Sequence, residues 1–130
     1  EAYKVSAHYA IARNGDVVRF VDDEDRAYHA GRSTMPVPGD DRTGLNDFSI
    51  GIELMSSHPD LDDEVKTPED AYTKEQYKAL NQLMGYLCDN HPIKYVVGHD
   101  EIAPGRKTDP GPLFQWEKVR DEGYKPVACE

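Results

Sequence analysis

Four side chains in the sequence have the types and spacing needed for hydrolytic chemistry. Glu53 stands in the apolar run IGIEL, where a carboxylate is costly to bury unless it is paired or bound to a cation. His99 follows a short apolar segment and a glycine, and Asp109 comes ten residues later across a proline-rich loop. Imidazole nitrogen and carboxylate oxygen are both zinc ligands, so His99 and Asp109 are candidate metal ligands. Lys107 lies two residues before Asp109, where its charge would be suited to stabilise an oxyanion.

Each of these residues also has an ordinary structural interpretation. Alternation along a strand can place Glu53 on a solvated edge instead of at a site. Lysines are mostly exposed, so Lys107 is equally consistent with a plain surface position. One histidine and one aspartate at this spacing are weak evidence for a metal on their own. The residue types therefore define a hypothesis that depends on the elements around them.

The first element expected to support this site is a β-hairpin. Asn14-Gly15 separates two β-prone runs, 5–13 and 16–21, and this dipeptide between such runs predicts a two-residue turn. A two-residue turn pairs Ile11 with Val18. The resulting register predicts a core-facing side made of Tyr9, Ile11, Val18 and Phe20.

The remaining elements predict a mixed α/β domain. The apolar run 48–54 is typical of a buried central strand. A helix is expected to begin after Thr73, which starts a capping box, and to end near Asn90. A short strand over 94–97 and a last helix over 113–120 complete the chain. We therefore expect an α/β fold with a small central mixed β-sheet flanked by helices.

Length and charge restrict the class of protein. The chain has 130 residues, enough for one domain, which we expect to span 1–130 with an acidic insertion over 56–72. A net charge of -10 disfavours binding to nucleic-acid backbone, and no apolar run approaches the length of a membrane span. Cys88 and Cys129 form one disulfide bridge or remain free thiols, and the sequence leaves both open.

Three sequence blocks together resemble a known enzyme family. They are VSAHYAIARNGDVVRFVDDEDRAYHAG, NDFSIGIEL and GHDEIAPGRKTDPGPLFQW. The chain resembles the type-2, zinc-dependent N-acetylmuramoyl-L-alanine amidases, a family related to phage T7 lysozyme and the peptidoglycan recognition proteins. The similarity is greatest to the anhydro-muropeptide amidase branch of AmpD and AmiD. It implies the fold of that family, Zn²⁺ as cofactor, and peptidoglycan or muropeptides as substrate.

The resemblance also implies a role for each candidate residue. His99 and Asp109 match two of the family's zinc ligands. Glu53 matches the general base, and Lys107 matches the lysine that stabilises the tetrahedral intermediate. The positions that match the substrate groove are His29, Asn46 and Arg106.

The expected reaction is cleavage of the amide bond between the lactyl group of N-acetylmuramic acid and L-alanine. The family's first zinc histidine lies on a strand before the VSAHY segment, and this chain begins at Glu1, a few residues before it. Either the chain is N-terminally truncated or it has lost the metal; we favour truncation because the other catalytic residues remain.

The alternative function is a metal-free peptidoglycan-binding module. The form of the substrate and the compartment (bacterial cytoplasm, cell envelope or phage-encoded) stay open, as does the oligomeric state.

Overall fold

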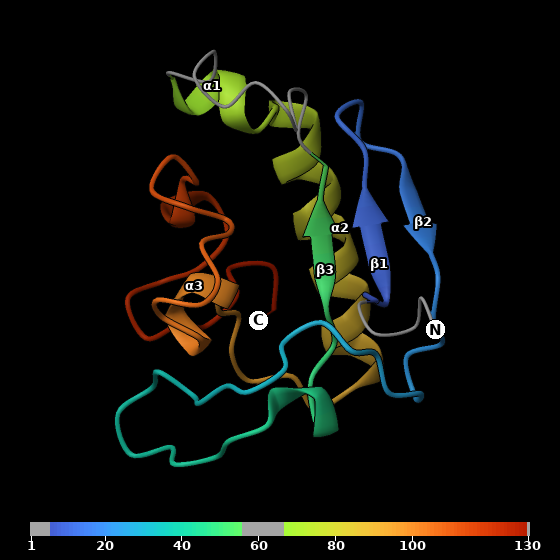
Figure 1. Cartoon of the computed structure of the whole chain (residues 1–130). Helices are drawn as coiled ribbons and strands as arrows, with labels where there is room; N and C mark the ends of the chain where they lie inside the picture. The colour runs from blue at the N-terminus through green and yellow to red at the C-terminus, as the bar shows by residue number, and fades with distance from the viewer. Residues whose placement is uncertain (1–5, 56–66, 130) are drawn as a thin grey trace.

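The computed structural model describes residues 6–55 and 67–129, and within them it confirms an α/β fold built on a small mixed sheet. The strands are β1 (Tyr9–Ile11), β2 (Val17–Arg19) and β3 (Ile52–Leu54), in the order β2-β1-β3 (Figure 1). β1 pairs antiparallel with β2 and parallel with β3. The central strand is buried throughout, so it forms the middle of the core.

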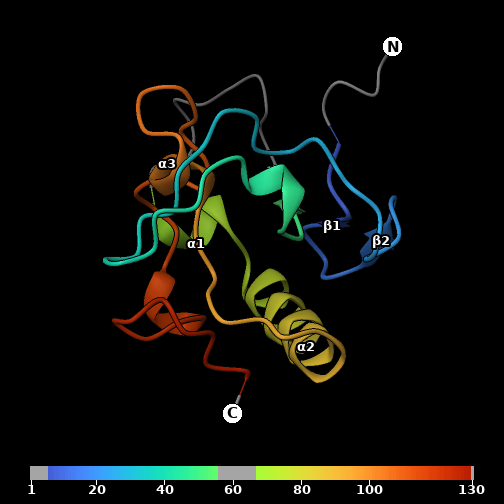
Figure 2. The ribbon, with the colours of Figure 1, turned by 90° about the horizontal axis from the view of Figure 1, so that it is seen from below.

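Helix α2 (Lys74–Asn90) covers one face of this sheet, as Figures 1 and 2 show. It begins at the predicted capping box, in which Thr73 and Gln76 exchange side-chain-to-backbone hydrogen bonds. The buried Gln76 amide also donates to the carbonyl oxygens of Ile11 and Met55, which fastens the helix to β1 and to the end of β3. The buried apolar face of α2 includes residues that recur at helical spacing in the sequence: Tyr77, Leu80, Leu83, Met84 and Leu87.

The hairpin between β1 and β2 is confirmed, but its predicted register is wrong. Ile11 pairs with Val17 instead of Val18, a shift of one residue. Because successive side chains on a strand alternate between faces, this shift takes Val18 and Phe20 off the side of the hairpin that Tyr9 and Ile11 occupy. Tyr9 and Ile11 are buried as expected, but every residue of β2 is exposed, and Val18 and Phe20 are 48% and 65% exposed.

The turn between the strands explains the shift. A two-residue type I′ turn needs positive φ at both central residues, but only Gly15, with φ 96°, has it here. Asn14 uses its side chain instead: Oδ1 accepts a hydrogen bond from the Asp16 amide at 2.9 Å. The loop therefore takes in Arg13 as a third residue, and Gly15 closes it with a 2.8 Å hydrogen bond from its amide to the Ala12 carbonyl.

Two elements predicted in the C-terminal half are wrong. Residues 94–97, which the structure describes, form no strand; the amide of Val96 bonds to the Tyr124 carbonyl outside the sheet. The helix predicted over 113–120 is reduced to η4 (Trp116–Lys118). Phe114 and Trp116 both pack inward, with ring centroids 4.7 Å apart. Residues two apart do not share a face of an α-helix, so this packing excludes the predicted helix.

The segment before β3 fixes the position of α3 (His99–Ile102). The loop over 31–47 contains η2 (Leu45–Asp47) and a bridge between Thr34 and Thr43. Its apolar side chains pack against α3 in a second core cluster, made of Ala30, Met35, Leu45, Ile102 and Ala103. Two segments far apart in the sequence, 29–47 and 99–103, are thereby held together.

The predicted acidic insertion, 56–72, is only partly covered, because 56–66 lie outside the described residues. Its last part forms α1 (Pro68–Ala71) and then Tyr72, whose ring packs against Tyr77 and Phe114. Tyr72 therefore belongs to the core boundary and is not a solvated residue.

Cys88 and Cys129 form a disulfide that ties the C-terminal segment to α2, with a Cα–Cα distance of 5.7 Å. Across the described ranges, every helix is too short or too polar to cross a bilayer.

Candidate active site

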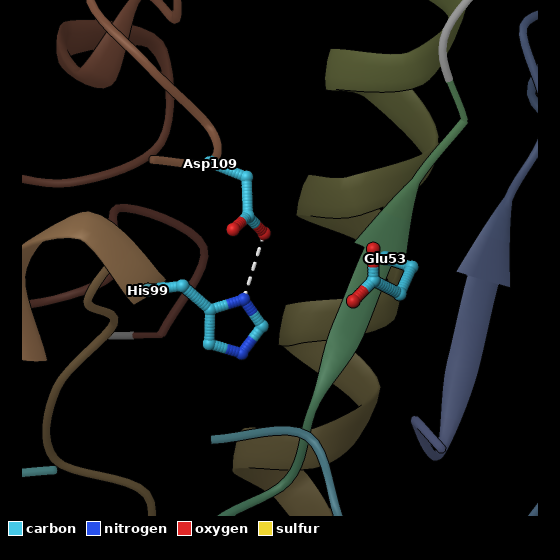
Figure 3. A group of neighbouring side chains, drawn as sticks. All are labelled: Glu53, His99 and Asp109. Carbon is cyan, nitrogen blue, oxygen red and sulfur yellow. Dashed lines mark hydrogen bonds and ion pairs between the residues drawn. The ribbon is translucent and has the colours of Figure 1, made fainter. Parts of the chain in front are cut away.

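Three of the predicted site residues meet in space although they come from different parts of the fold. Glu53 is the middle residue of β3, His99 is the first residue of α3, and Asp109 lies on the loop that follows α3 (Figure 3). One ligand atom from each residue lies within 4.8 Å of the others. His99 Nδ1 is 2.7 Å from Asp109 Oδ2, and the Glu53 carboxylate faces this pair from β3.

The three residues line one cavity of about 330 Å³. Its wall is largely apolar and is formed by β3, α2 and the segments on either side of α3. Polar groups gather at one part of this wall, which is the arrangement that binding sites for small molecules commonly have. The polar side chains there are His29, Ser49, Glu53, His99 and Asp109.

The two carboxylates of the cluster differ in acidity. The hydrogen bond from His99 lowers the pKa of Asp109 below its ordinary value. Burial, together with the negative charge of Asp109, raises the pKa of Glu53. One imidazole and two carboxylates converging within this distance are a donor set suited to a divalent cation such as zinc, and a cation would also relieve the repulsion between the carboxylates. The residues therefore fit the metal that the resemblance implies.

His29 lies directly behind His99. Its side chain is buried, with Nδ1 3.1 Å from His99 Nε2 and Nε2 2.9 Å from Ser49 Oγ. Burial and the neighbouring imidazole of His99 lower the pKa of His29 to about 4. Gly51 allows this ring to sit against the backbone, because a Cβ at that position would lie 2.5 Å from the ring.

Two other predicted groove residues hold the backbone next to His29. The buried Asn46 accepts hydrogen bonds from the amides of His29 and Ala30, at 3.1 and 2.8 Å. The Arg106 guanidinium donates to the carbonyls of Ala30 and Arg32. Their polar atoms thus shape the wall that carries His29.

The remaining predicted catalytic residue, Lys107, is half-buried beside the cluster. Its charge lowers the pKa of Asp109 further, and it opposes the effect of burial on the pKa of Glu53. The lysine charge therefore acts on both carboxylates of the site.

Sequence reasoning missed two contributors to the site. Ser49 contacts His29, and no feature of the sequence indicated this contact, because Ser49 lies inside the run 48–54 that predicts a buried strand. The hydroxyl of Tyr72 donates to the Pro110 carbonyl at 2.8 Å and so supports the loop that carries Asp109. Tyr72 was hidden because it ends a stretch dominated by acidic residues.

Sequence comparison identifies the family to which this fold and site belong. A family model described as N-acetylmuramoyl-L-alanine amidase matches residues 1–112, so the chain belongs to that amidase family. The mixed sheet, α2 and the Glu53–His99–Asp109 cluster all lie within the matched range.

Individual relatives agree with this assignment. The 1,6-anhydro-N-acetylmuramyl-L-alanine amidase AmpD of Escherichia coli is 43% identical over 119 residues, covering 90% of this chain and 57% of AmpD. The N-acetylmuramoyl-L-alanine amidase AmiD of E. coli is 36% identical, covering 92% of this chain and 45% of AmiD. A solved structure of AmiD superimposes with a TM-score of 0.72 at 34% identity, covering 88% of this chain and 46% of that structure. The chain thus spans about half the length of these relatives.

Proposed function

We propose that the chain is the catalytic part of a zinc-dependent amidase that cleaves the bond between the lactyl group of N-acetylmuramic acid and L-alanine. The observation that supports this most directly is the convergence of Glu53, His99 and Asp109 in one cavity. The family assignment adds the reaction class, because AmpD is a 1,6-anhydro-N-acetylmuramyl-L-alanine amidase and AmiD an N-acetylmuramoyl-L-alanine amidase. We also propose that residues 1–130 form a single domain, since the disulfide joins the end of the chain to α2.

His99 and Asp109 are the proposed metal ligands. When bound, the zinc ion supplies positive charge that polarises the scissile carbonyl and makes water more acidic. Asp109 suits this task because the same hydrogen bond that lowers its pKa keeps it ionised. His99 presents its Nδ1 on the side that faces Asp109 and Glu53.

Glu53 is the proposed general base. Its raised pKa lies closer to neutral pH than the pKa of an ordinary glutamate, and this favours reversible proton transfer. Glu53 accepts the proton of the attacking water and passes it to the amine of L-alanine as the amide bond breaks. Lys107 stabilises the negative charge that develops on the carbonyl oxygen.

A muropeptide is the proposed substrate, bound in the 330 Å³ cavity. The solved AmiD structure is a complex with anhydro-N-acetylmuramic acid-L-Ala-D-gamma-Glu-L-Lys, which supports this class of ligand for a related site. His29, Asn46 and Arg106 are proposed to form the groove wall.

The test is release of the stem peptide from a defined muropeptide. The protein, expressed from its complete gene and loaded with stoichiometric zinc, is incubated with anhydro-N-acetylmuramyl-tripeptide, and products are followed by liquid chromatography and mass spectrometry. We expect free tripeptide and the anhydro sugar, loss of activity after chelation, and recovery when zinc is restored. An intact muropeptide in the presence of bound zinc would contradict the proposal. Retention of muropeptide without zinc or cleavage would instead identify a binding module.

A further inference from the structure

We propose that Ser49 and His29 are positioning residues that select which ring nitrogen of His99 faces the metal. This inference rests on the proposed function, in which His99 is a metal ligand. It assigns His29 a task different from the groove-lining role implied by the resemblance, and it gives a task to Ser49, which the sequence motifs did not indicate.

The chain of hydrogen bonds starts at a backbone carbonyl. Ser49 Oγ lies 2.6 Å from the carbonyl oxygen of Leu45, and a carbonyl can only accept. The serine hydroxyl therefore donates its hydrogen to Leu45, and its lone pairs are left for His29 Nε2, 2.9 Å away. The hydrogen of the His29 ring consequently sits on Nε2.

This fixes the other nitrogen of His29 as an acceptor. The ring is 6% exposed, and among the described residues its two nitrogens contact only a hydroxyl and an imidazole, with no carboxylate to compensate a positive charge. The unprotonated Nδ1 points at His99 Nε2, 3.1 Å away. The backbone of Gly51 packs closely against one side of the His29 ring.

The last link is His99 itself. With His29 Nδ1 as acceptor, His99 Nε2 must keep its hydrogen, so Nδ1 is the ring nitrogen whose hydrogen, shared with Asp109, a metal ion would replace. That atom is 2.7 Å from Asp109 Oδ2, on the side where Glu53 also lies. A metal ion needs a deprotonated nitrogen, and the partner on the opposite ring nitrogen fixes which one is available. The relay from Leu45 through Ser49 and His29 thus prepares His99 Nδ1 as a ligand.

Zinc affinity of three serine variants tests this relay without relying on catalysis. Ser49→Ala removes the acceptor for His29 Nε2, and Ser49→Thr retains a hydroxyl. Ser33→Ala is the matched control, because Ser33 is also buried in this wall and bonds to Gly31 and Leu45 without touching the cluster. We expect Ser49→Ala to weaken Zn²⁺ binding about 10-fold, within the range of about 10- to 100-fold known for such partners, in competition with a chromophoric chelator. Ser49→Thr should restore most of the affinity, and Ser33→Ala should match the parent.

Two further measurements complete the design. His29→Leu should weaken Zn²⁺ binding by up to about 100-fold, and its folding is checked by circular dichroism; Ser49→Ala keeps the test valid if this variant does not fold. Long-range ¹H–¹⁵N NMR of the zinc-loaded parent should show a hydrogen on His99 Nε2 and none on Nδ1.

The outcomes separate this inference from the proposed function. If the parent binds zinc and cleaves muropeptide while Ser49→Ala and folded His29→Leu bind zinc as tightly as the parent, the relay is wrong and the amidase proposal stands. If His29→Leu raises the KM for muropeptide and leaves the zinc affinity unchanged, the relay is also overturned, and His29 lines the substrate groove instead. Metal bound through His99 Nε2 would also overturn the relay. A parent that binds no zinc would overturn both proposals together.

Discussion

The described part of the chain contains two histidine–aspartate pairs whose distances are similar and whose surroundings differ. His99 Nδ1 lies 2.7 Å from Asp109 Oδ2, and His91 Nε2 lies 3.0 Å from Asp23 Oδ2. The side chain of Asp109 is 52% exposed and faces the carboxylate of Glu53. The side chain of Asp23 is 6% exposed, so the second pair is enclosed.

The enclosed pair is completed by hydrogen-bond donors. The Tyr9 hydroxyl donates to the other oxygen of Asp23, and Arg19 donates to that hydroxyl at 3.2 Å. Burial raises the pKa of Asp23, but the hydrogen bonds from Tyr9 and His91 outweigh it and hold the pKa below its ordinary value. All of these contacts join β1, β2 and the C-terminal end of α2. The Asp23 pair is therefore a structural tie.

The difference shows what distinguishes a site from a tie. Donors occupy both oxygens of Asp23, whereas the Asp109 pair faces a second carboxylate whose pKa is raised by burial and by the charge of Asp109. Two carboxylates that converge with no hydrogen bond between them favour a cation. Contact between a histidine and an aspartate is thus insufficient evidence for metal binding. The second carboxylate, that of Glu53, is what distinguishes the Asp109 pair from the Asp23 pair.

The largest expected effect comes from removing the carboxylate of Glu53. Glu53→Gln makes the His99–Asp109 pair resemble the enclosed pair, with no second carboxylate. We expect turnover of anhydro-muropeptide to fall by about 100- to 10,000-fold, the usual contribution of a general base. Steady-state kinetics of the zinc-loaded protein measure this, with circular dichroism to show that the fold is retained. Turnover within a factor of about two of the parent would show that Glu53 is not the base.

A positively charged side chain near each histidine–aspartate pair gives a second test. The charge of Lys107 lowers the pKa values of Glu53 and Asp109, whereas the charge of Arg19 lowers the pKa of Asp23 in the structural tie. Lys107→Ala should lower kcat by about 100-fold with a much smaller change in KM, because its charge is needed once negative charge develops on the carbonyl oxygen. Arg19→Ala should leave kcat unchanged. Equal effects of the two substitutions on kcat would break the comparison.

The two pairs should differ in the opposite direction in their contribution to stability, so that a substitution in the enclosed Asp23 pair costs more than one in the Asp109 pair. Asp23→Ala leaves the Tyr9 hydroxyl and the His91 ring without their partner, and breaking a buried network of this kind costs about 3 kcal/mol. We expect Tm to fall by roughly 10 °C for a domain of this size.

The matched variant for this measurement is Asp109→Ala. In the presence of chelator its unfolding free energy should change by less than about 1 kcal/mol, because Asp109 is half-exposed. Thermal unfolding followed by circular dichroism compares the two variants directly. A larger loss for Asp109→Ala would mean that the site, and not the tie, holds the fold together.

The sequence predicts best what is local. The start of α2 follows from Thr73 and Gln76, three residues apart, and its buried face follows from helical spacing. The residues of the candidate site were found in the same way, because Glu53 and His99 adjoin short apolar segments and Asp109 lies in a loop near His99. The resemblance then identified these positions as a set.

Features that depend on distant contacts were not predictable. The contact of His91 is one example, because its partner Asp23 lies 68 residues earlier and no spacing rule connects them. The hairpin register depended on whether Asn14 would take a positive φ or use its side chain, and both are normal for asparagine. The relay through Ser49 joins residues that only the folded chain brings together.

The smallest expected effect concerns pH and again separates the two pairs. The pKa of Glu53 is raised above its ordinary value of 4.5 in the folded metal-free protein, so the ionised form of Glu53 favours unfolding at neutral pH. Glu53→Gln should therefore stabilise the chelated protein at pH 7, by less than about 1 kcal/mol, because the carboxylate, although set in the cavity wall, remains accessible to solvent. The gain should disappear as pH falls through the folded pKa to below 4.5, where Glu53 of the parent is protonated in both the folded and the unfolded state.

Asp23→Asn should show the opposite sign. It destabilises the protein at pH 7, and this loss of stability relative to the parent shrinks only as pH falls below 3.8, because the folded pKa of Asp23 is lowered. Urea unfolding between pH 3 and pH 7 measures both curves, and a loss of stability at pH 7 in Glu53→Gln would mean that Glu53 is compensated in the same way as Asp23.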